Sequence, residues 1–167
     1  MDIDVRVIGM DEILAVLDAR KRCLEDMSQF WASVGEYLVK RTIRNFEREE
    51  SPAGEKWVPW ADRDAILKRR PKSKNRGKMK KGPPKILVST GDLRRSVTSR
   101  EKDKNAIFYA LKDRLILGSK LPYAATHQFG DSRNGRNIPA RPYLGVTEQD
   151  RTEILRMMRE YFRRRRR

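Results

Sequence analysis

The stretch LEDMSQFWASVGEYLVKRTIRNF, residues 24–46, decides the fold. Its larger apolar side chains fall near helical spacing, at Met27, Phe30, Trp31, Val34, Leu38 and Ile43. On a helix of 3.6 residues per turn, this spacing gathers the side chains on one broad face. The pattern predicts a long helix that forms the spine of the fold. Aromatic residues at this spacing indicate core packing rather than a ligand site.

The residues before this stretch predict two further elements. Residues 3–9 alternate between apolar and charged side chains, which is typical of a half-buried strand that Gly9 closes. Asp11 can then cap a helix through residues 13–17, and the helical pattern resumes at Leu24. The single cysteine, Cys23, excludes an intramolecular disulfide and a thiolate zinc cluster, and we interpret it as a small buried or boundary residue.

The residues after the long helix predict a turn, a loop and a short helix. Residues 51–60 contain Pro, Gly and two tryptophans, so they should fold back against the helix. Residues 61–70 could form one more helix before a long basic loop. The apolar run at 86–88 is followed by cap-forming residues at 89–93, which predict a single turn of helix ending near Val97.

The second half predicts a hairpin and two helices. Residues 106–111 and 114–117 are expected to be strands joined at Lys112-Asp113, with Gly118 ending the second. Residues 122–130 predict a short helix stopped by its glycine, and an extended segment follows through Pro139 and Pro142. Thr147 and Asp150 suggest an N-cap for a final helix. Its apolar face would use Ile154, Leu155, Met158 and Phe162.

Together these elements describe an α+β fold, in which a long N-terminal helix packs on a small antiparallel sheet. A C-terminal helix and a long basic loop complete it. The chain has 167 residues, which is enough for one domain with a core, and no repeat or second core interrupts it. We therefore expect residues 1–167 to form a single domain.

The charge is strongly positive, at a formal +16, which favours partners such as nucleic acid, an anionic membrane or an acidic protein. It concentrates in a basic loop at residues 68–85 and in an arginine tail. For both segments, phosphate binding and docking on an acidic protein are equally open, because aromatic residues that would stack on bases are missing. For the arginine tail, membrane binding is a distant third alternative. The candidate binding residues are Lys68, Arg69, Arg70, Lys72, Lys74, Arg76, Lys78, Lys80, Lys81, Lys85, Arg163, Arg164, Arg165, Arg166 and Arg167.

Catalytic and cofactor motifs are missing from the sequence. With one histidine, His127, neither a His-rich zinc motif nor a histidine pair can be built, and no phosphate-binding glycine loop or Gly-x-Ser-x-Gly occurs. A Ser-His-Asp group is arithmetically possible with Ser89, Ser96 or Ser119, although nothing in the sequence brings them together. We expect no enzyme activity, no metal and no cofactor. His127 is interpreted as structural, hydrogen-bonded beside Tyr123 and Phe129.

Neither a membrane span nor a secretion signal is expected. The longest apolar run is far shorter than the roughly 20 residues that a bilayer requires. The N-terminus has no basic region followed by an apolar one. The protein is therefore expected to be made and used in the cytoplasm.

Five short sequence words stand in order along the chain. The first is Phe46, and the second is Pro52-x-Gly54-x-x-Trp57. The third is Ile86-Leu87-Val88-x-Thr90-Gly91-x-Leu93-x-x-Ser96, the fourth is Tyr123-Ala124-x-x-His127-Gln128-Phe129-Gly130, and the fifth is Ile138-Pro139-Ala140-Arg141-Pro142-Tyr143-Leu144-Gly145. In this order they resemble the phage virion morphogenesis family, which covers tail completion proteins of Mu-like and P2-like phages. The resemblance extends from about residue 25 to about residue 162.

The resemblance implies a non-enzymatic virion protein, located at the tail or neck, that completes the tail and joins it to the head. It also implies a homo-oligomeric ring, expected to be a hexamer, that contacts tail terminator and head-tail connector proteins, with packaged DNA as a further contact. The longer basic loop and the arginine tail depart from the family pattern and leave the exact neck position open. The alternative is a general nucleic-acid-binding protein that uses the basic loop and the arginine tail.

Several residues of these words make structural sense on their own. Trp57 and the turn before it should lock the chain against the long helix, while Thr90 and Gly91 start a turn whose Leu93 points inward. Tyr123, His127 and Phe129 should close one end of the sheet, with Gly130 ending their helix. Arg141, held between Pro139 and Pro142, should be rigidly presented.

The composition of residues 68–85 generates a first prediction. The stretch has almost no apolar anchor and repels itself, so it should be mobile in the purified subunit and ordered only in the assembled particle. Limited trypsin digestion of the subunit should cut there first, and the particle should be protected. Equal protection in subunit and particle would contradict the prediction.

Overall fold

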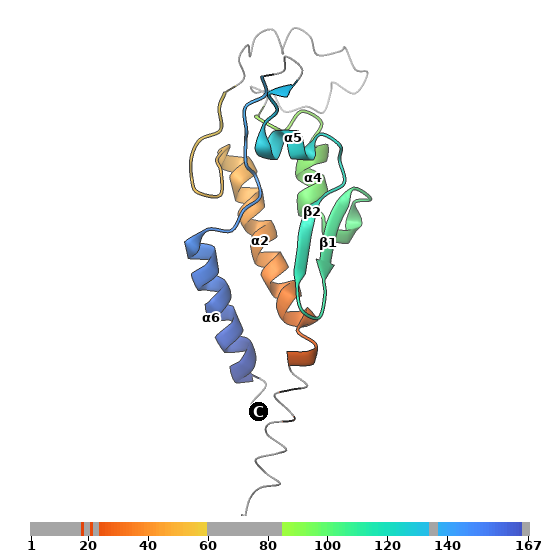
Figure 1. The fold of residues 1–167 in the computed structure, drawn as a ribbon, viewed down its shortest axis with the longest axis vertical. Helices are drawn as coiled ribbons and strands as arrows, with labels where there is room; N and C mark the ends of the chain where they lie inside the picture. Colours follow the sequence, from red (N-terminus) through yellow and green to blue (C-terminus); the bar gives the residue numbers. More distant parts are fainter. Residues whose placement is uncertain (1–17, 19–20, 22–23, 60–84, 134–136, 165–167) are drawn as a thin grey trace, which may run out of the picture.

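The computed structural model describes residues 18, 21, 24–59, 85–133 and 137–164. Its spine is α2 (Ser28–Arg48), which lies along the long axis of the molecule in Figure 1. The strands β1 (Ala106–Ala110) and β2 (Leu115–Ser119) pack on one flank of α2, and α6 (Glu148–Arg164) packs on the other. The predicted α+β architecture, with a helical spine and a small antiparallel sheet, is confirmed.

Three shorter helices complete the described chain. The 3-10 helix η2 (Arg100–Lys102) follows α4 (Asp92–Thr98) and contacts β1. The helix α5 (Ala124–Phe129) lies with α4 at the end of the molecule where α2 finishes (Figure 1). That end contains the candidate site, because the sequence words of the second half converge there.

The sheet approaches α2 closely at one glycine. β1 and β2 are antiparallel and in register from Ala106 opposite Ser119 to Ala110 opposite Leu115. The ring of Phe108 points at α2. A Cβ added to Gly35 would lie only 2.5 Å from Cζ of Phe108. A larger residue at position 35 would therefore push the hairpin away from the helix.

Two apolar clusters lie along α2. Near its start, Met27, Phe30 and Val34 are buried under the apolar face of α6. Near its end, a larger cluster surrounds Phe46 and includes Trp57, Ile86, Leu87, Leu93, Val97, Ala124 and Tyr143. The spine thus binds α6 at one end and the loop-rich part of the chain at the other.

A buried carboxylate joins α6 to α2. Asp150, which is only 1% exposed, accepts hydrogen bonds from the Thr147 amide (2.9 Å) and hydroxyl (2.7 Å). It also accepts one from Tyr37 Oη (2.6 Å) and pairs with Arg41 Nε (3.0 Å). The predicted Thr147–Asp150 cap is confirmed, and the same carboxylate anchors the helix to the spine.

These contacts shift two pKa values. Burial works against the charge of Asp150, but the hydrogen bonds from Thr147 and Tyr37 and the charge of Arg41 outweigh it and hold its pKa below the usual value. Burial and the hydrogen bond to Asp150 raise the pKa of Tyr37 to about 12. Asp150 therefore stays ionised and Tyr37 protonated at neutral pH.

Several sequence-based expectations are confirmed. The segment after α2 folds back, with Trp57 buried against it, and α4 ends one residue beyond the expected Val97. The hairpin turn lies at the predicted place, and α5 ends at Gly130. The segment around Pro139 and Pro142 has no regular secondary structure.

Three expectations about element limits and faces are wrong. The helical pattern does not run unbroken from Leu24, because Asp26 and Met27 are not helical; Met27 N donates to Lys112 O (3.0 Å) instead. β2 does not end at Gly118, because Ser119 still pairs with Ala106. Leu155 is 53% exposed, since α6 contacts α2 through Ile154, Met157, Met158, Tyr161 and Phe162.

Other expectations lie outside the described residues. They are the strand at 3–9, the cap at Asp11 with its helix, Cys23, Trp60, the helix at 61–70 and the basic loop as far as residue 84.

The Asp150 contacts generate a second prediction. Asp150→Ala should lower the free energy of unfolding by about 2–3 kcal/mol, because charged hydrogen bonds are lost and Arg41 keeps no partner at its Nε. Thr147→Ala should lose only about 1 kcal/mol, the scale of one helix cap. Urea unfolding measures both.

The pH dependence is a further check on Asp150. A depressed carboxyl pKa stabilises the fold above the unfolded pKa, so this contribution should disappear as pH falls below about 4. The difference in stability between wild type and Asp150→Asn should therefore narrow in acid. A difference that stays constant from neutral pH into acid would count against the contacts described here.

Candidate functional site

An aromatic cluster forms the base of the site. Phe46, on the last turns of α2, lies 5.5 Å from the rings of both Trp57 and Tyr143. Trp57 Nε1 donates to Pro142 O (2.8 Å), and Tyr143 Oη donates to Ala124 O (3.1 Å). Three chain segments far apart in sequence are therefore joined at one point. Burial raises the pKa of Tyr143 to about 12, so its hydroxyl remains a donor.

Amide side chains hold the extended segment that contains Tyr143. Gln128 Oε1 accepts from the amides of Tyr143 and Leu144 (both 3.1 Å), while its Nε2 donates to Leu144 O (2.7 Å). Asn45 Nδ2 donates to Tyr143 O (3.2 Å). These bonds replace the partners that a neighbouring strand would supply.

Arg141 is buried rather than presented, which corrects the expectation from its flanking prolines. Only 6% of the residue is exposed, and its guanidinium donates to Val58 O (2.8 Å) and Pro59 O (3.3 Å). Its amide donates to His127 O (2.8 Å). Arg141 thus links α5 to the point where the described chain stops before residues 60–84. Burial lowers the pKa of its guanidinium.

Gly130 ends α5 at a close approach of two backbone segments. Its φ of 78° lies in the region that favours glycine, and a Cβ there would be 2.9 Å from Ile138 O. The next residue, Asp131, forms an isolated bridge with Ile138. The glycine is therefore required both by its backbone angle and by the space available.

The Thr90-Gly91 turn begins α4 as expected. Gly91 precedes the helix with φ 81°, and Leu93 points into the core. Glu49, in the left-handed region at the end of α2, accepts from Ile86 N (2.6 Å) through its carboxylate. The carboxylate of Glu49, the residue that caps α2, thus positions the irregular segment that leads into the Thr90-Gly91 turn.

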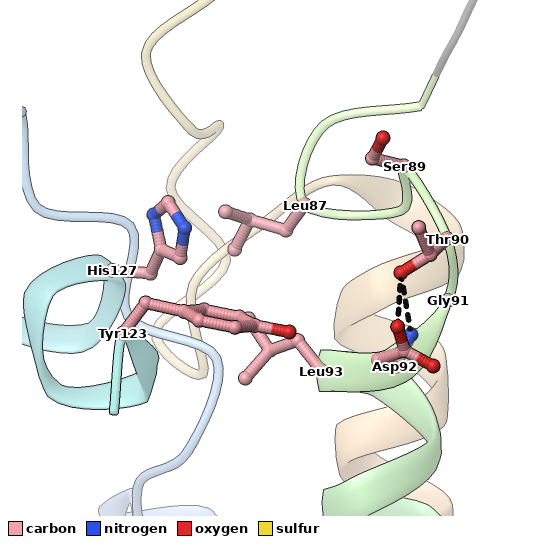
Figure 2. Close-up of a pocket in the computed structure, with 8 residues that line it drawn as sticks. All are labelled: Leu87, Ser89, Thr90, Gly91, Asp92, Leu93, Tyr123 and His127. Carbon is pink, nitrogen blue, oxygen red and sulfur yellow. Dashed lines mark hydrogen bonds between the residues drawn. The ribbon is translucent and has the colours of Figure 1, made fainter. Parts of the chain in front are cut away.

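A pocket of about 140 Å³ lies between this turn and α5. Figure 2 shows its walls: His127 comes from α5 and Tyr123 from the residue that caps it, and the others come from the segment leading into α4 and from its first two residues. The lining residues are Leu87, Ser89, Thr90, Gly91, Asp92, Leu93, Tyr123 and His127. Two of the five sequence words therefore meet at one surface hollow.

The pocket does not assemble the Ser-His-Asp group that the sequence left open. Asp92 accepts from Thr90 Oγ1 (2.5 Å) and pairs with Arg95, and within the described chain His127 Nδ1 has no hydrogen-bond partner. Ser96 is fully buried and bonded to Ser119 (2.7 Å). No proton relay connects these groups in this arrangement.

His127 differs from expectation in one respect and agrees in another. Its ring packs edge-on against Tyr123, with centroids 5.9 Å apart, but its Nδ1 has no hydrogen-bond partner among the residues that the structure describes. Burial, followed by the charge of Arg141, lowers its pKa, so His127 is neutral at neutral pH.

Phe129 does not close the sheet. It is 78% exposed, because it lies about 200° around α5 from His127 at 100° per residue. Tyr123 is also partly exposed at the rim of the pocket, at 41%. α5 therefore presents an aromatic surface to solvent.

The predicted binding residues fall at two ends of the molecule. Lys85 is exposed beside the end of α2, where its Nζ donates to Glu47 O (3.2 Å). Arg163 and Arg164 are exposed at the last turn of α6, at the opposite end in Figure 1. The other candidates, Lys68–Lys81 and Arg165–Arg167, lie outside the described residues.

The arrangement organises backbone segments rather than reactive groups. In the described ranges, no three His, Cys, Asp or Glu residues are grouped so that they could hold a metal ion. None of the helices in that part of the chain has both the length and the hydrophobicity needed to cross a bilayer. The residues of the five words mainly support each other's positions and leave one pocket and one aromatic surface.

Comparison with known proteins gives a consistent result. A family model described as "Phage virion morphogenesis family" matches residues 8–163. The chain is 29% identical over 163 residues to "Mu-like prophage FluMu G protein 2" of Haemophilus influenzae, and the match covers 96% of each chain. It is 30% identical over 128 residues to "Putative capsid assembly protein G" of Escherichia phage Mu, covering 74% of this chain and 71% of the relative. No solved structure gives a significant match to this chain.

The environment of His127 generates a third prediction. A lowered pKa means that the fold favours the neutral ring, whereas the unfolded chain takes up a proton near pH 6.5. This residue's contribution to stability should therefore be full above about pH 6.5 and should fall as the pH drops below it. His127→Gln should remove that part of the pH dependence. Urea unfolding at about pH 7.5 and about pH 5.5 tests this, and parallel losses in both proteins would contradict it.

Proposed function

Because the chain belongs to the phage virion morphogenesis family, we propose that it acts in tail completion and joins the tail to the filled head. It works as one subunit of a homo-oligomeric ring at the neck of the virion, with six copies as the expected number. Its partners are the tail terminator and head-tail connector proteins. It assembles in the host cytoplasm and stays in the virion.

The observation that carries this proposal is that strongly basic segments are attached at two opposite ends of the described body. Residues 60–84 hold ten Lys and Arg against two Asp, a net +8, which is half of the formal charge of the chain. This segment leaves and rejoins the described body at Pro59 and Lys85, near α5. The arginines that end α6 lie at the other end.

The separation of the two ends can be measured along α2, because residues near each end of this helix contact the segments that lie there. Asn45 bonds to Tyr143 near one end, and the ring of Phe30 lies 5.7 Å from Tyr161 near the other. Fifteen residues of helix separate Phe30 from Asn45, which corresponds to about 22 Å. A subunit that attracts acidic partners at both ends suits a joint between two other structures.

A structural role without catalysis also agrees with the site. Within the described chain the pocket brings no nucleophile and base into hydrogen-bond contact, and Thr90 and Asp92 are occupied by local bonds. The buried polar groups instead hold the extended segment in place. Such a rigid scaffold serves assembly, in which the relative position of surfaces matters.

The second candidate function is general nucleic-acid binding, and the charge of residues 60–84 is the observation that favours it. Such a protein should bind duplex or RNA as a monomer, with a steep loss of affinity as salt rises. A ring subunit should bind partner proteins and show only weak, charge-driven binding to nucleic acid. Titration with duplex at two salt concentrations separates the two.

Deleting the gene from a phage that carries it tests the proposed function. We expect DNA-filled heads and separate tails in the lysate, because head and tail assembly proceed and only joining fails. Electron microscopy makes the measurement, and the intact gene supplied in trans should restore whole virions. Normal infectious particles would overturn the proposal. Missing or malformed heads would instead favour a capsid assembly role, the one printed in the name of the phage Mu relative.

Removing part of the charge should give a milder defect. Shortening residues 68–85, or removing Arg163–Arg167, should slow joining, since long-range attraction sets the encounter rate while apolar contacts hold the joint. A replacement loop of equal length made of Gly and Ser controls for the change in length.

A further inference from the structure

The hairpin is apolar on both of its faces. Its inner face packs on α2 through Phe108, which is buried against Gly35. On its outer face, Tyr109 and Ile116 are direct cross-strand partners, and they are 48% and 43% exposed. An antiparallel sheet with one solvated face normally alternates apolar and polar residues. This outer face breaks that rule and is suited to a partner.

More apolar residues extend the outer face along the hairpin. Ile107 lies opposite Gly118, and a Cβ on that glycine would lie 3.8 Å from Ile107 Cδ1. Leu111 is exposed at the start of the turn. We call Ile107, Tyr109, Leu111 and Ile116 the outer hairpin face.

The edges around this face are positively charged. Lys102, Lys104, Lys112 and Lys120 are all exposed, and none forms an ion pair with another described residue. Asp113 at the turn is already paired with Arg114. An occupant of this face should therefore be apolar and carry negative charge at its borders.

One segment of this chain has that composition. Residues 1–18 contain five acidic residues and a single arginine, a net −4 in a chain of +16. The same residues include nine large apolar side chains besides Met1: Ile3, Val5, Val7, Ile8, Met10, Ile13, Leu14, Val16 and Leu17. We call residues 1–18 the N-terminal arm. It complements the outer hairpin face in both charge and hydrophobicity.

The N-terminal arm also joins the body beside this face. Met27, which starts the described spine, donates its amide to Lys112 O at the hairpin turn (3.0 Å). The nearby described residues, at 18, 21 and 24–26, are all exposed. Of the outer hairpin face, Tyr109, Leu111 and Ile116 are exposed and Ile107 is half-buried.

We propose that the N-terminal arm of one copy binds the outer hairpin face of an adjacent copy. This inference rests on the proposed ring, because it supplies the contact between neighbouring subunits. The interaction is heterologous: each subunit gives an arm and receives one on its hairpin, and such a contact forms a ring when the rotation between neighbouring subunits closes.

A pair of matched substitutions in the full-length protein tests the receiving surface. Ile116→Lys should weaken self-association roughly 100-fold, the scale of losing one central interface side chain. Leu155→Lys introduces the same charge at a comparably exposed apolar residue on α6, and self-association should be unchanged. Analytical ultracentrifugation measures both. Equal effects of the two substitutions, or no effect of Ile116→Lys on an oligomeric wild type, would overturn the proposal.

Disulfide trapping identifies the occupant. In a Cys23→Ser background, one tagged copy carries Ile116→Cys and a second, differently tagged copy carries Val7→Cys. Mixing them under oxidation should give a disulfide-linked pair of unlike copies, and Leu155→Cys in place of Ile116→Cys should not. The doubly substituted chain should form the disulfide between copies rather than within one. A disulfide formed only within one chain, or none in assembled rings, would overturn the proposal.

The two proposals fail in distinguishable ways. If wild-type particles contain no ring of this protein, the proposed function is wrong and the arm has no neighbour to bind. If the ring is present but Ile116→Lys leaves it intact, the proposed function stands and the assignment of the hairpin face is wrong.

Discussion

The buried path of the extended segment Arg141–Leu144 is the constraint on which the site depends. This segment pairs with no strand, yet its backbone polar groups lie in or beside the core. Their partners are side chains of three other segments: Trp57 bonds to Pro142 O, Asn45 to Tyr143 O, and Gln128 to both Tyr143 and Leu144. Because an unsatisfied buried backbone group costs roughly 1–3 kcal/mol, α2, α5 and the turn at Trp57 must keep their relative positions.

The same constraint explains the five sequence words. Residues that mark a family can be ligand-binding residues, but here they mostly contact one another's segments. This holds for Trp57, His127, Gln128, Gly130 and Arg141. These residues form a network of local bonds, so a substitution at one of them removes contacts to several segments at once. The groups left to meet a partner are the less constrained ones: the exposed ring of Phe129, the rim of the pocket and the charged ends.

Elements with a strong local signal could be predicted from the sequence, and contacts between distant residues could not. Periodicity identified α2, the hairpin and α6, and cap chemistry identified the Thr147–Asp150 pair. The link from Asp150 to Tyr37 spans 113 positions and has no local signature. The roles of Asn45 and Gln128 do not follow from helical periodicity, although an uncharged amide inside an apolar helical pattern indicates a buried hydrogen bond. Arg141 was misplaced because its flanking prolines indicate rigidity but not direction.

The like charge at the two ends of the body limits how copies can associate. Arg163 and Arg164 end the molecule at one side, and the +8 segment is attached at the other. A contact between Arg163 and Arg164 of one copy and the segment 60–84 of another would bring positive charge against positive charge. In the proposed ring, this repulsion would oppose stacking of copies through these two ends. A neighbour of opposite charge would be favoured there instead.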